Sequence, residues 1–416
     1  MLRKTGFATI IFATAATVLP VQAGGLWITE YNQPTQGRAG AGEEAGNGDA
    51  SDAFLNPASM SRHTESQLMV NGGLILPNVE FDVDRGSVLN GDGDGGDAGG
   101  LTPSASVFYS RPLNERWSLG ISGLALTGSA LDYDDDWVGR FQAQDVTLIV
   151  IGAIPAVAFK ATDKLSFGLA VPVMYSNLEL DIAVPELITA PDTGEGKAEV
   201  DGDDVQVAAS VSFHYQFSEQ TALGGRATSK FQFDYDGDIE ARYLGQVGVS
   251  TELTLANLAR IGLSHDFNDR WSGYATVGWD NWSQMDEVLL STNSRGATLP
   301  RNWEDTYHYA LGADYRLDDQ WTLRAGIAYD TSPVDEDDRT ADMPIDEQFR
   351  YAIGADYLRD SGMKVSGSLV YADYGDAEIE NSGDLGLVGF SGDYQTNEIW
   401  FASLSFNWPL SSGSRR

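Results

Sequence analysis

The 416-residue chain contains no cysteine and only four histidines. Without cysteine it can form no disulfide, no thiolate metal site and no cysteine nucleophile. The histidines are far apart in the sequence, which argues against a histidine-rich metal site. They are His63, His214, His265 and His308. We therefore expect no metal and no other cofactor.

Basic residues are also scarce. The chain has 26 lysines and arginines against 61 aspartates and glutamates, so its formal net charge is −35. This excess argues against nucleic acid as a partner, because little would neutralise the phosphates. A solvated acidic surface is the simplest interpretation, and the charge says little about the fold.

Long apolar runs are absent as well. After the first residues, no segment reaches the roughly 18 apolar residues that a membrane helix needs. The nearest candidate, residues 147–159, is shorter and contains Pro155. A membrane protein of this sequence would therefore have to cross the bilayer with strands.

Residues 1–23 are typical of a secretory signal peptide. Arg3 and Lys4 form a positive start, Phe7–Leu19 is a short apolar run, and the small Ala23 precedes the expected cut. The apolar run is too short for a transmembrane anchor. We expect an exported chain that begins near Gly24 and is periplasmic, secreted or inserted in the outer membrane.

Alternation with period two dominates the remaining sequence. In residues 321–330 one set of alternate positions carries large apolar side chains, such as Trp321 and Ile327, and the other carries small or charged ones, such as Arg324 and Asp330. This period places the two sets on opposite faces of a strand. Residues 307–317, 349–357 and 400–408 show the same pattern.

Two features favour a membrane barrel over a soluble sandwich. Aromatic residues lie near the strand ends, as in the girdles of a barrel. Short polar turns also alternate with long acidic, glycine-rich stretches, as expected for periplasmic turns and outer loops. The aromatic residues are Trp117, Trp271, Trp321, Tyr357 and Trp408. The short turns are Asn114-Glu115, Thr162-Asp163, Ser218-Glu219, Asn268-Asp269, Asp318-Asp319 and Ser361-Gly362; the long stretches are residues 84–100, 133–144, 182–202, 237–251, 286–304, 331–345 and 376–392.

Six short and seven long connections predict an all-β fold, a 14-stranded antiparallel transmembrane β-barrel over residues 63–410. Residues 24–62 break the alternation and are rich in glycine and alanine. They could form a disordered tail, but the apolar Trp27 and Phe54 favour a hatch, or plug, in the lumen. Residues 411–416 would be a short C-terminal tail.

The hatch segment carries the motifs that resemble a known family. They are Gly37-Arg38-Ala39-Gly40-Ala41-Gly42, Asp49-Ala50-Ser51-Asp52-Ala53-Phe54 and Asn56-Pro57-Ala58-Ser59-Met60. Further matches are residues 133–140, 164–168 and 321–334. The chain resembles the outer-membrane long-chain fatty-acid transporters (FadL-like, including the toluene and xylene channels), over nearly the whole mature length. The hatch-motif positions are Gly37, Arg38, Asn56, Pro57, Ala58 and Met60.

The resemblance implies passive uptake of a hydrophobic ligand, a long-chain fatty acid or a hydrocarbon, across the outer membrane. The ligand would be caught among outer loops, the hatch would shift, and the ligand would leave sideways at an inward kink of the third strand. Gly128, with Gly123, is the candidate for this kink, since glycine inside a strand often marks a bend. Ordinary barrel glycines remain the alternative. We expect a monomer that contacts membrane lipid and lipopolysaccharide.

Arg324 and Arg350 lie on faces interpreted as lumenal, where either could pair with a fatty-acid carboxylate. Lumenal ion pairs with Asp314, Asp330 or Asp356 are the favoured alternative. After the fifth strand, where the family often has basic residues, this chain carries Asn177, Glu179 and Asp181. That departure gives weight to a neutral hydrocarbon ligand.

Three other functions can be weighed from the sequence. An open porin for small polar solutes is the main alternative. A hydrolase is disfavoured because Ser212 and His214, two apart on one face, lie too far apart for nucleophile and base, and no Gly-x-Ser-x-Gly elbow is present. Residues 90–97 are oxygen-rich but lack the later glutamate of a calcium loop, so a plain acidic loop is expected. We therefore predict a transporter and not an enzyme.

Overall fold

The computed structural model describes residues 26–87, 91–184, 195–241, 245–285, 287–292, 296–381 and 389–410. The predicted signal peptide and the C-terminal tail lie outside these residues. Within them no helix is long and apolar enough to cross a membrane.

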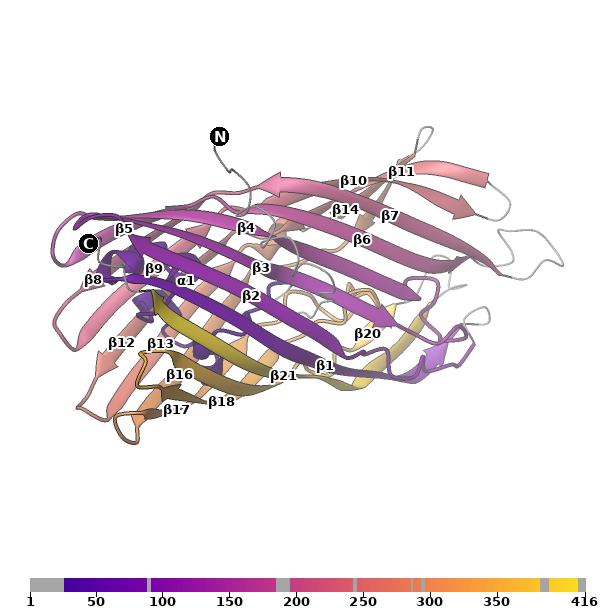
Figure 1. Cartoon of the computed structure of the whole chain (residues 1–416). Coiled ribbons are helices and arrows are strands. Elements are labelled where there is room, and N and C mark those ends of the chain that lie inside the picture. Colours follow the sequence, from indigo (N-terminus) through magenta and orange to yellow (C-terminus); the bar gives the residue numbers. More distant parts are fainter. Residues whose placement is uncertain are drawn as a thin grey trace, which may run out of the picture.

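The described chain is almost entirely β-structure (Figure 1). The strands are β1 (Ser66–Gly86), β2 (Thr102–Pro112), β3 (Trp117–Asp132), β4 (Asp145–Lys160), β5 (Leu165–Ala170), β6 (Val173–Val184), β7 (Gly196–Val207), β8 (Ser210–Gln216), β9 (Thr221–Thr228), β10 (Phe231–Ala241), β11 (Gly245–Leu255), β12 (Leu258–Asp266), β13 (Trp271–Asp280), β14 (Glu287–Thr292), β15 (Gly296–Pro300), β16 (Thr306–Arg316), β17 (Trp321–Asp330), β18 (Gln348–Leu358), β19 (Lys364–Asp373), β20 (Ile379–Asn381) and β21 (Phe390–Leu410).

The wall is a closed antiparallel barrel. Strand β1 pairs with β2 on one side and with β21 on the other, from Ser66 opposite Leu410 onward. Four wall strands are each interrupted once, so that each is divided into two segments: β5 and β6, β7 and β8, β9 and β10, and β11 and β12. Pro172, which has no backbone N–H donor, lies at the interruption between β5 and β6. Counting each pair once and leaving out β14, β15 and β20 in the long connections gives fourteen wall strands among the described residues. The predicted fold is confirmed.

The alternation of side chains follows the expected faces. In β17, Trp321, Leu323 and Ile327 are exposed on the outside, whereas Ala328 and Asp330 are buried inside. Aromatic pairs mark both ends of the outer apolar band. They are Trp117–Phe159, Trp271–Tyr315 and Trp321–Tyr357 at the short-turn end, and Tyr329–Phe349 and Tyr371–Trp400 towards the other end. A barrel that meets lipid headgroups has such girdles.

All six short turns join the strands that the sequence predicts. Three of the long stretches are less loop-like than expected. The described parts of residues 182–202, 237–251 and 286–304 are largely strand. Strands β6, β7, β10 and β11 continue the wall beyond the girdle, and β14 and β15 pair with each other beside β11. Acidic, glycine-rich composition obscured these strands, although backbone pairing needs no apolar side chain once a neighbouring strand is in place.

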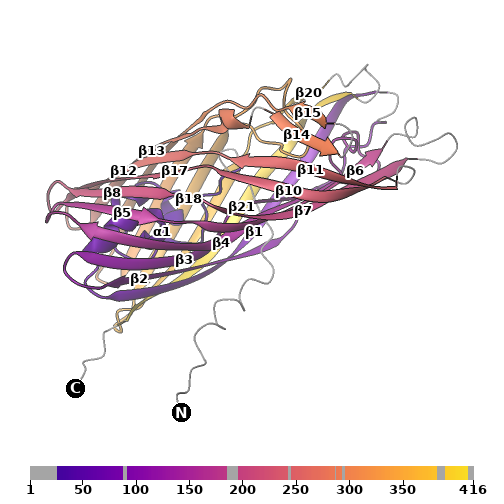
Figure 2. The same ribbon diagram turned by 90° about the horizontal axis from the view of Figure 1, so that it is seen from above.

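The N-terminal segment lies inside the barrel at the end that carries the short turns (Figure 2). It contains four short helical turns: η1 (Pro34–Arg38), η2 (Glu43–Ala45), α1 (Asp52–Leu55) and η3 (Pro57–Arg62). Almost every residue from Leu26 to Met60 is buried. This segment is called the hatch below; its predicted limits, 24 and 62, remain a prediction.

Candidate functional site

The hatch rests directly on the backbone of the wall where the inner face carries glycine. A Cβ added at Gly326 would lie 2.2 Å from the Arg38 carbonyl oxygen, and one added at Gly354 would lie 2.9 Å from Gly37 Cα. Any larger residue would push the hatch away. The small Gly37 is needed for the same reason, since its own Cβ would meet Gly354.

Arg38 fixes the middle of the hatch. Its Nε donates to the Ala41 carbonyl at 2.6 Å, its Nη2 to Asn47 at 2.9 Å, and its Nη1 lies 3.3 Å from Asp314 of β16. The guanidinium also stacks over the Tyr274 ring at 3.8 Å. A fully buried guanidinium requires this many partners because an unpaired charge would be costly to bury.

The Asn-Pro-Ala-x-Met motif fixes the other end. The Asn56 side chain accepts from the Ala58 amide at 3.1 Å and donates to the Phe213 carbonyl at 2.9 Å. Pro57 begins η3, where no backbone donor is needed. Met60 packs over Gly120 of β3, where an added Cβ would come within 2.5 Å of the Met60 sulfur. Asn56, Pro57, Ala58 and Met60 thus lie against β3, β5 and β8, whereas Gly37 and Arg38 lie against β16 to β18.

Ser212 and His214, the pair weighed for a hydrolase, also hold the hatch. Ser212 Oγ accepts from the Ala58 amide at 3.1 Å, and His214 Nδ1 lies 3.3 Å from Ser59 Oγ. The two side chains have separate partners, so they form no nucleophile and base.

The first candidate ligand contact, Arg324, is engaged by carboxylates. Its Nη2 lies 2.5 Å from Asp356 Oδ2 and 3.8 Å from Asp314 Oδ2. Lys364 extends this network, at 4.0 Å from Asp356 and 2.9 Å from Asp49 of the hatch. Burial raises the pKa of Asp49, but Lys364, Ser51 and Arg324 together outweigh it and hold this pKa below its ordinary value.

The second candidate, Arg350, is fully buried and paired. It forms ion pairs with Asp330 and, at 3.3 Å, with Glu30 of the hatch, and Asp330 also binds His308 at 2.8 Å. The structure therefore places both arginines in lumenal ion pairs, the alternative left open above. Their contact with a ligand stays a prediction.

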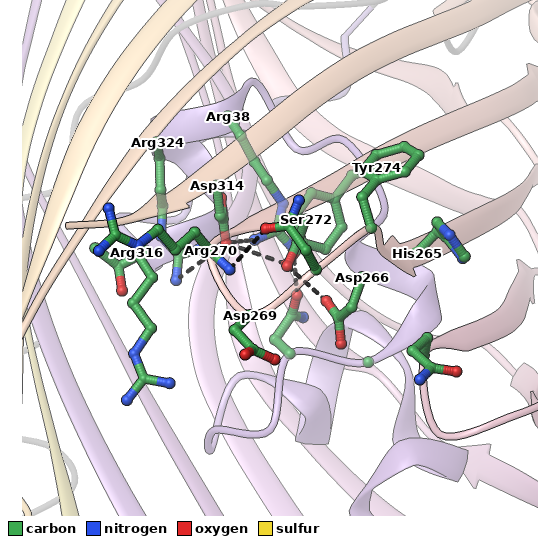
Figure 3. Close-up of a pocket in the computed structure, with 16 residues that line it drawn as sticks. Arg38, His265, Asp266, Asp269, Arg270, Ser272, Tyr274, Asp314, Arg316 and Arg324 are labelled. Atoms are coloured by element: carbon green, nitrogen blue, oxygen red, sulfur yellow. Dashed lines mark hydrogen bonds and ion pairs between the residues drawn. The ribbon is translucent and has the colours of Figure 1, made fainter. Parts of the chain in front are cut away.

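A polar cavity of about 710 Å³ opens at the short-turn end. Arg38, Arg324 and Tyr274 converge there on Asp314, while Arg270 and Arg316 lie nearer the turns (Figure 3). Charged and polar groups line it almost throughout, so it suits water and polar groups and not an acyl chain.

Strand β3 has an irregular central part. Its ladder with β2 runs from Ser118 to Gly123 and then stops, although β2 and β3 both continue. Its ladder with β4 has a bulge at Leu126, because Ala125 and Thr127 oppose consecutive residues. Gly128 itself pairs regularly with Ile149. The irregularity therefore lies between the two predicted kink glycines, and their role stays a prediction.

The start of the hatch crosses behind this unpaired part of the wall. On the β3 side, the Ile28 amide donates to Leu126 at 3.3 Å, and the Thr127 hydroxyl donates to Leu26. On the β2 side, Ser106 donates to the Tyr31 carbonyl, and Asn32 donates to Ser104 at 2.9 Å. Residues 26–32 are called the gate segment. They hydrogen-bond to both β2 and β3 where these two strands no longer pair with each other.

The lumen beside the gate segment is apolar. Trp27 packs against Phe231 and Trp282, with ring centroids about 6 Å apart. Leu126 and Ile154 of the wall belong to the same cluster. A small cavity of about 20 Å³ lies among Trp27, Phe54, Leu126, Ile154, Pro172 and Phe231, with Arg226 on one side.

Aromatic side chains pack together at the opposite, loop-bearing end. Tyr133 stacks on Trp137 at 3.9 Å, and Phe81 meets Trp137, Phe390 and Tyr394 edge-on. Residues 91–97 pack on this cluster, with Gly93 bridging to Trp137. Among the described residues no group of three potential metal ligands gathers.

Sequence reasoning missed the gate segment and Arg226. Neither carries a motif: the stop in the β2–β3 ladder is a matter of register between strands, and Arg226 is one of several inward arginines. Its alternation with Gly224 and Thr228 could have placed it on the lumenal face, but not beside a cavity.

Comparisons with known proteins place these features in a family. The model of the outer membrane protein transport proteins (OMPP1/FadL/TodX) matches residues 13–408. The long-chain fatty acid transport protein of Escherichia coli O6:H1 is 26% identical over 390 residues, covering 83% of this chain and 86% of that protein. Outer membrane protein P1 of Haemophilus influenzae is 24% identical over 380 residues, covering 79% and 82%.

Solved structures show the same fold. A Pseudomonas aeruginosa FadL homologue superposes with a TM-score of 0.85 at 22% identity, covering 92% of this chain and 99% of that one. The Pseudomonas putida toluene transporter TodX gives a TM-score of 0.69 at 15% identity, covering 94% and 99%. Because the family model spans nearly the whole sequence, this chain belongs to the outer membrane protein transport family (OMPP1/FadL/TodX).

Proposed function

We propose that this chain is a passive channel that takes up hydrophobic compounds, long-chain fatty acids or hydrocarbons, and releases them sideways between β2 and β3. The supporting observation is the gate segment, which stands between an apolar lumen and the place where the β2–β3 ladder stops. An acyl chain or an aromatic ring gains roughly 25 cal/mol per Å² of apolar surface that leaves water, which favours entry into such a lumen.

Family membership confirms that the chain is an outer-membrane transport protein and not an enzyme. One relative is named a long-chain fatty acid transport protein and another a toluene transporter, so both ligand classes are candidates for this chain. The proposed sequence of events is capture at the outer loops, passage into the lumen, displacement of the gate segment, and exit between β2 and β3. We propose further that the mature chain begins near Gly24 and works as a monomer.

Few hydrogen bonds hold the gate segment to β2 and β3, compared with the ion pairs that hold the hatch to the far wall. Its bonds to β3 and β2 are neutral, each contributing about 0.5–1.5 kcal/mol. In contrast, Glu30 ties the middle of the gate segment to Arg350 of β18, and outside the segment Arg38 reaches Asp314 of β16. A ligand could therefore displace the gate segment from β2 and β3 while Glu30 and the hatch motifs stay in place.

The test is uptake of labelled oleate and of labelled toluene by a Gram-negative host that lacks its own channel of this kind. Folded barrel in the outer membrane is verified by heat-modifiable migration on a gel. Uptake of either ligand above the empty vector supports the proposal. Folded barrel that takes up neither compound contradicts it.

An open porin is the second candidate, because the polar cavity opens at the short-turn end. Deleting residues 26–62 separates the two functions. If the hatch plugs the lumen, ionic conductance in a planar bilayer rises sharply, whereas an open porin changes little. Wild-type conductance near that of the deletion variant would favour the porin.

A further inference from the structure

The second helical turn of the hatch, η2, carries two neighbouring glutamates into the barrel. Glu43 is 5% exposed and Glu44 is fully buried. The turn fits between β9 and β12 because Gly224 and Gly262 are register partners there. A Cβ added at Gly224 would lie 1.7 Å from the Glu44 carbonyl oxygen, and one at Gly262 would lie 2.8 Å from Glu44 Oε2. While η2 is seated in this way, the two carboxyl groups have little access to water.

Neither glutamate has a cation beside it. Among the described residues, no lysine, arginine or histidine nitrogen lies within 4.0 Å of either carboxyl group. Glu43 accepts from the Thr35 hydroxyl at 3.4 Å, and Glu44 accepts from the Thr276 hydroxyl at 3.0 Å. Glu44 Oε1 is buried without a hydrogen-bond partner. Two adjacent buried charges held only by neutral donors are costly, so one of the two acids should carry a proton.

The charges around η2 balance one ionised glutamate and not two. Three arginines act on Glu43, and two of them have an aspartate of their own. These two are Arg38 of η1 with Asp314, and Arg260 of β12 with Asp280 of β13. The third, Arg226 of β9, has no carboxylate within 4.0 Å among the described residues. The other titratable groups that face this part of the lumen are Tyr31 and Glu30 of the gate segment, His214 of β8 and Tyr274 of β13.

The proton belongs to Glu43. Burial, together with Glu44, raises the pKa of Glu43 to about 8, although the three arginines lower it. If η2 left β9 and β12 and became exposed to water, this carboxyl group would regain its ordinary pKa of 4.5. Tyr31 stays neutral throughout, because burial raises its pKa further above 10.0. Between these two values for Glu43, the seated hatch therefore holds one proton more than the released hatch.

We propose that a proton held on Glu43 locks the hatch onto β9 and β12, and that the hatch is held progressively less firmly as the medium becomes alkaline. This inference rests on the proposed function, in which the hatch plugs the channel, and adds a regulation by pH. Release gives the proton to the medium. Its equilibrium constant should therefore rise by about tenfold per pH unit from about pH 5 to about pH 8, and stay level above that.

The experiment follows the ionic conductance of the purified full-length barrel in a planar bilayer from about pH 5 to about pH 9. Release of η2 should let ions past the hatch on this side, so the fraction of time in a conducting state should rise with pH and then level off. The urea midpoint of the same barrel in detergent is a second measurement. It should fall over the same range, because unfolding also exposes Glu43.

Three variants separate the proton from a merely structural role. Glu43→Gln has the shape of the protonated acid, so its conductance should stay at the acidic level of the wild type. Glu30→Gln removes another buried glutamate of the hatch, but one with Arg350 as its partner, and should keep the wild-type dependence on pH. Glu44→Gln removes the negative neighbour of Glu43, so conductance should level off at a lower pH. This shift keeps the test decisive if Glu43→Gln fails to fold.

Wild-type conductance and urea midpoints that run parallel to those of Glu43→Gln would overturn the inference. An unchanged levelling-off in Glu44→Gln would overturn it as well. Neither result affects the proposed channel as long as the wild type takes up oleate or toluene. Conversely, a wild type that takes up neither compound removes the channel, while the pH dependence of its hatch can still be measured. The failures of the two proposals are therefore distinguishable.

Discussion

The barrel wall holds the hatch differently on its two sides. At β16, β17 and β18 the ladders are continuous, glycines bring the hatch backbone against the wall, and Arg38 and Arg350 tie it down with buried ion pairs. At β2 and β3 the ladder stops after Gly123, and the gate segment is held by a few neutral hydrogen bonds and apolar packing.

This difference indicates which part of the hatch can move at a low cost in free energy. Regions with few buried polar anchors open at lower free energy than regions tied by complete ladders and buried charges. A ligand that enters the lumen would therefore displace the gate segment from β2 and β3 before it broke the buried ion pairs at β16 and β18. The anchored side would keep the barrel plugged for ions throughout.

The largest expected effect is a loss of uptake when β2 is cross-linked to β3. Ala105→Cys with Ala125→Cys places thiols on β2 and β3 just beyond their last paired residues, in a chain that has no other cysteine. Cross-linking them with a short bifunctional thiol reagent should reduce uptake to near the empty-vector level, because the lateral exit is bridged. Uptake of labelled oleate and toluene is measured before and after cross-linking.

The control for this clamp is Val70→Cys with Val107→Cys, two residues that are already paired between β1 and β2. Cross-linking there should leave uptake unchanged. Unimpaired uptake by the barrel clamped at 105 and 125 would rule out exit between β2 and β3.

The next largest effect concerns the strong side. Arg350→Gln leaves Glu30 without its buried cation and Asp330 with His308 alone, so the free energy of unfolding should fall by about 3–5 kcal/mol. Unfolding of the purified barrel in urea measures it. The exposed Arg316→Gln, which loses only a surface pair, should change stability by less than about 0.5 kcal/mol. Oleate binding that fell with unchanged stability would instead make Arg350 the ligand contact predicted from the sequence.

A moderate effect is expected where the hatch touches backbone. Gly326→Ala forces a methyl against the Arg38 carbonyl, and such overpacking typically costs about 1–3 kcal/mol. Gly367→Ala is the matched control, because its Cβ would meet Leu404 at an ordinary 3.6 Å. Unfolding in urea and ionic conductance are compared for both. Equal stability and equal conductance of the two variants would show that the hatch does not depend on this close contact between Gly326 and Arg38.

The smallest expected effect is a loss in the free energy of unfolding that is equal for a variant in β3 and a variant in β17. Trp117→Leu and Trp321→Leu each remove an aromatic pair from the girdle at the short-turn end, and we expect a loss of about 0.5–1.5 kcal/mol for each. There the ladders of β3 and β17 are equally complete. A much larger loss for Trp117→Leu would mean that the weakness of β3 extends to its first residues.

Much of the wall could be predicted because its signals are local. Trp321 and Ile327 share a face with period two, and Asp318-Asp319 reads as a turn, whatever lies next to the strand. The hatch motifs could be recognised as well, and each contacts the inner face of the wall. The strands within residues 182–202 and 237–251 were missed because their acidic composition resembles a loop, while neighbouring strands supply the pairing.

Partners across the lumen could not be predicted. The sequence offered Asp314, Asp330 and Asp356 to Arg324 and Arg350 without a way to choose, and it did not single out Arg226. Which charge is compensated depends on register between strands and on where the hatch lies. These are distances between residues far apart in the chain, and period two carries no information about them.

The sequence by itself determined an exported antiparallel barrel with fourteen strands, an apolar outer band and an N-terminal segment that carries the hatch motifs of the family. These follow from alternation, turn spacing and short motifs, which act over a few residues. Only the tertiary structure decided that the β2–β3 ladder ends at Gly123, that residues 26–32 cross behind it, and that Arg324 and Arg350 pair with Asp356 and Asp330. Each depends on closing the wall around the hatch, because burial and charge compensation are properties of the closed lumen and not of any one strand.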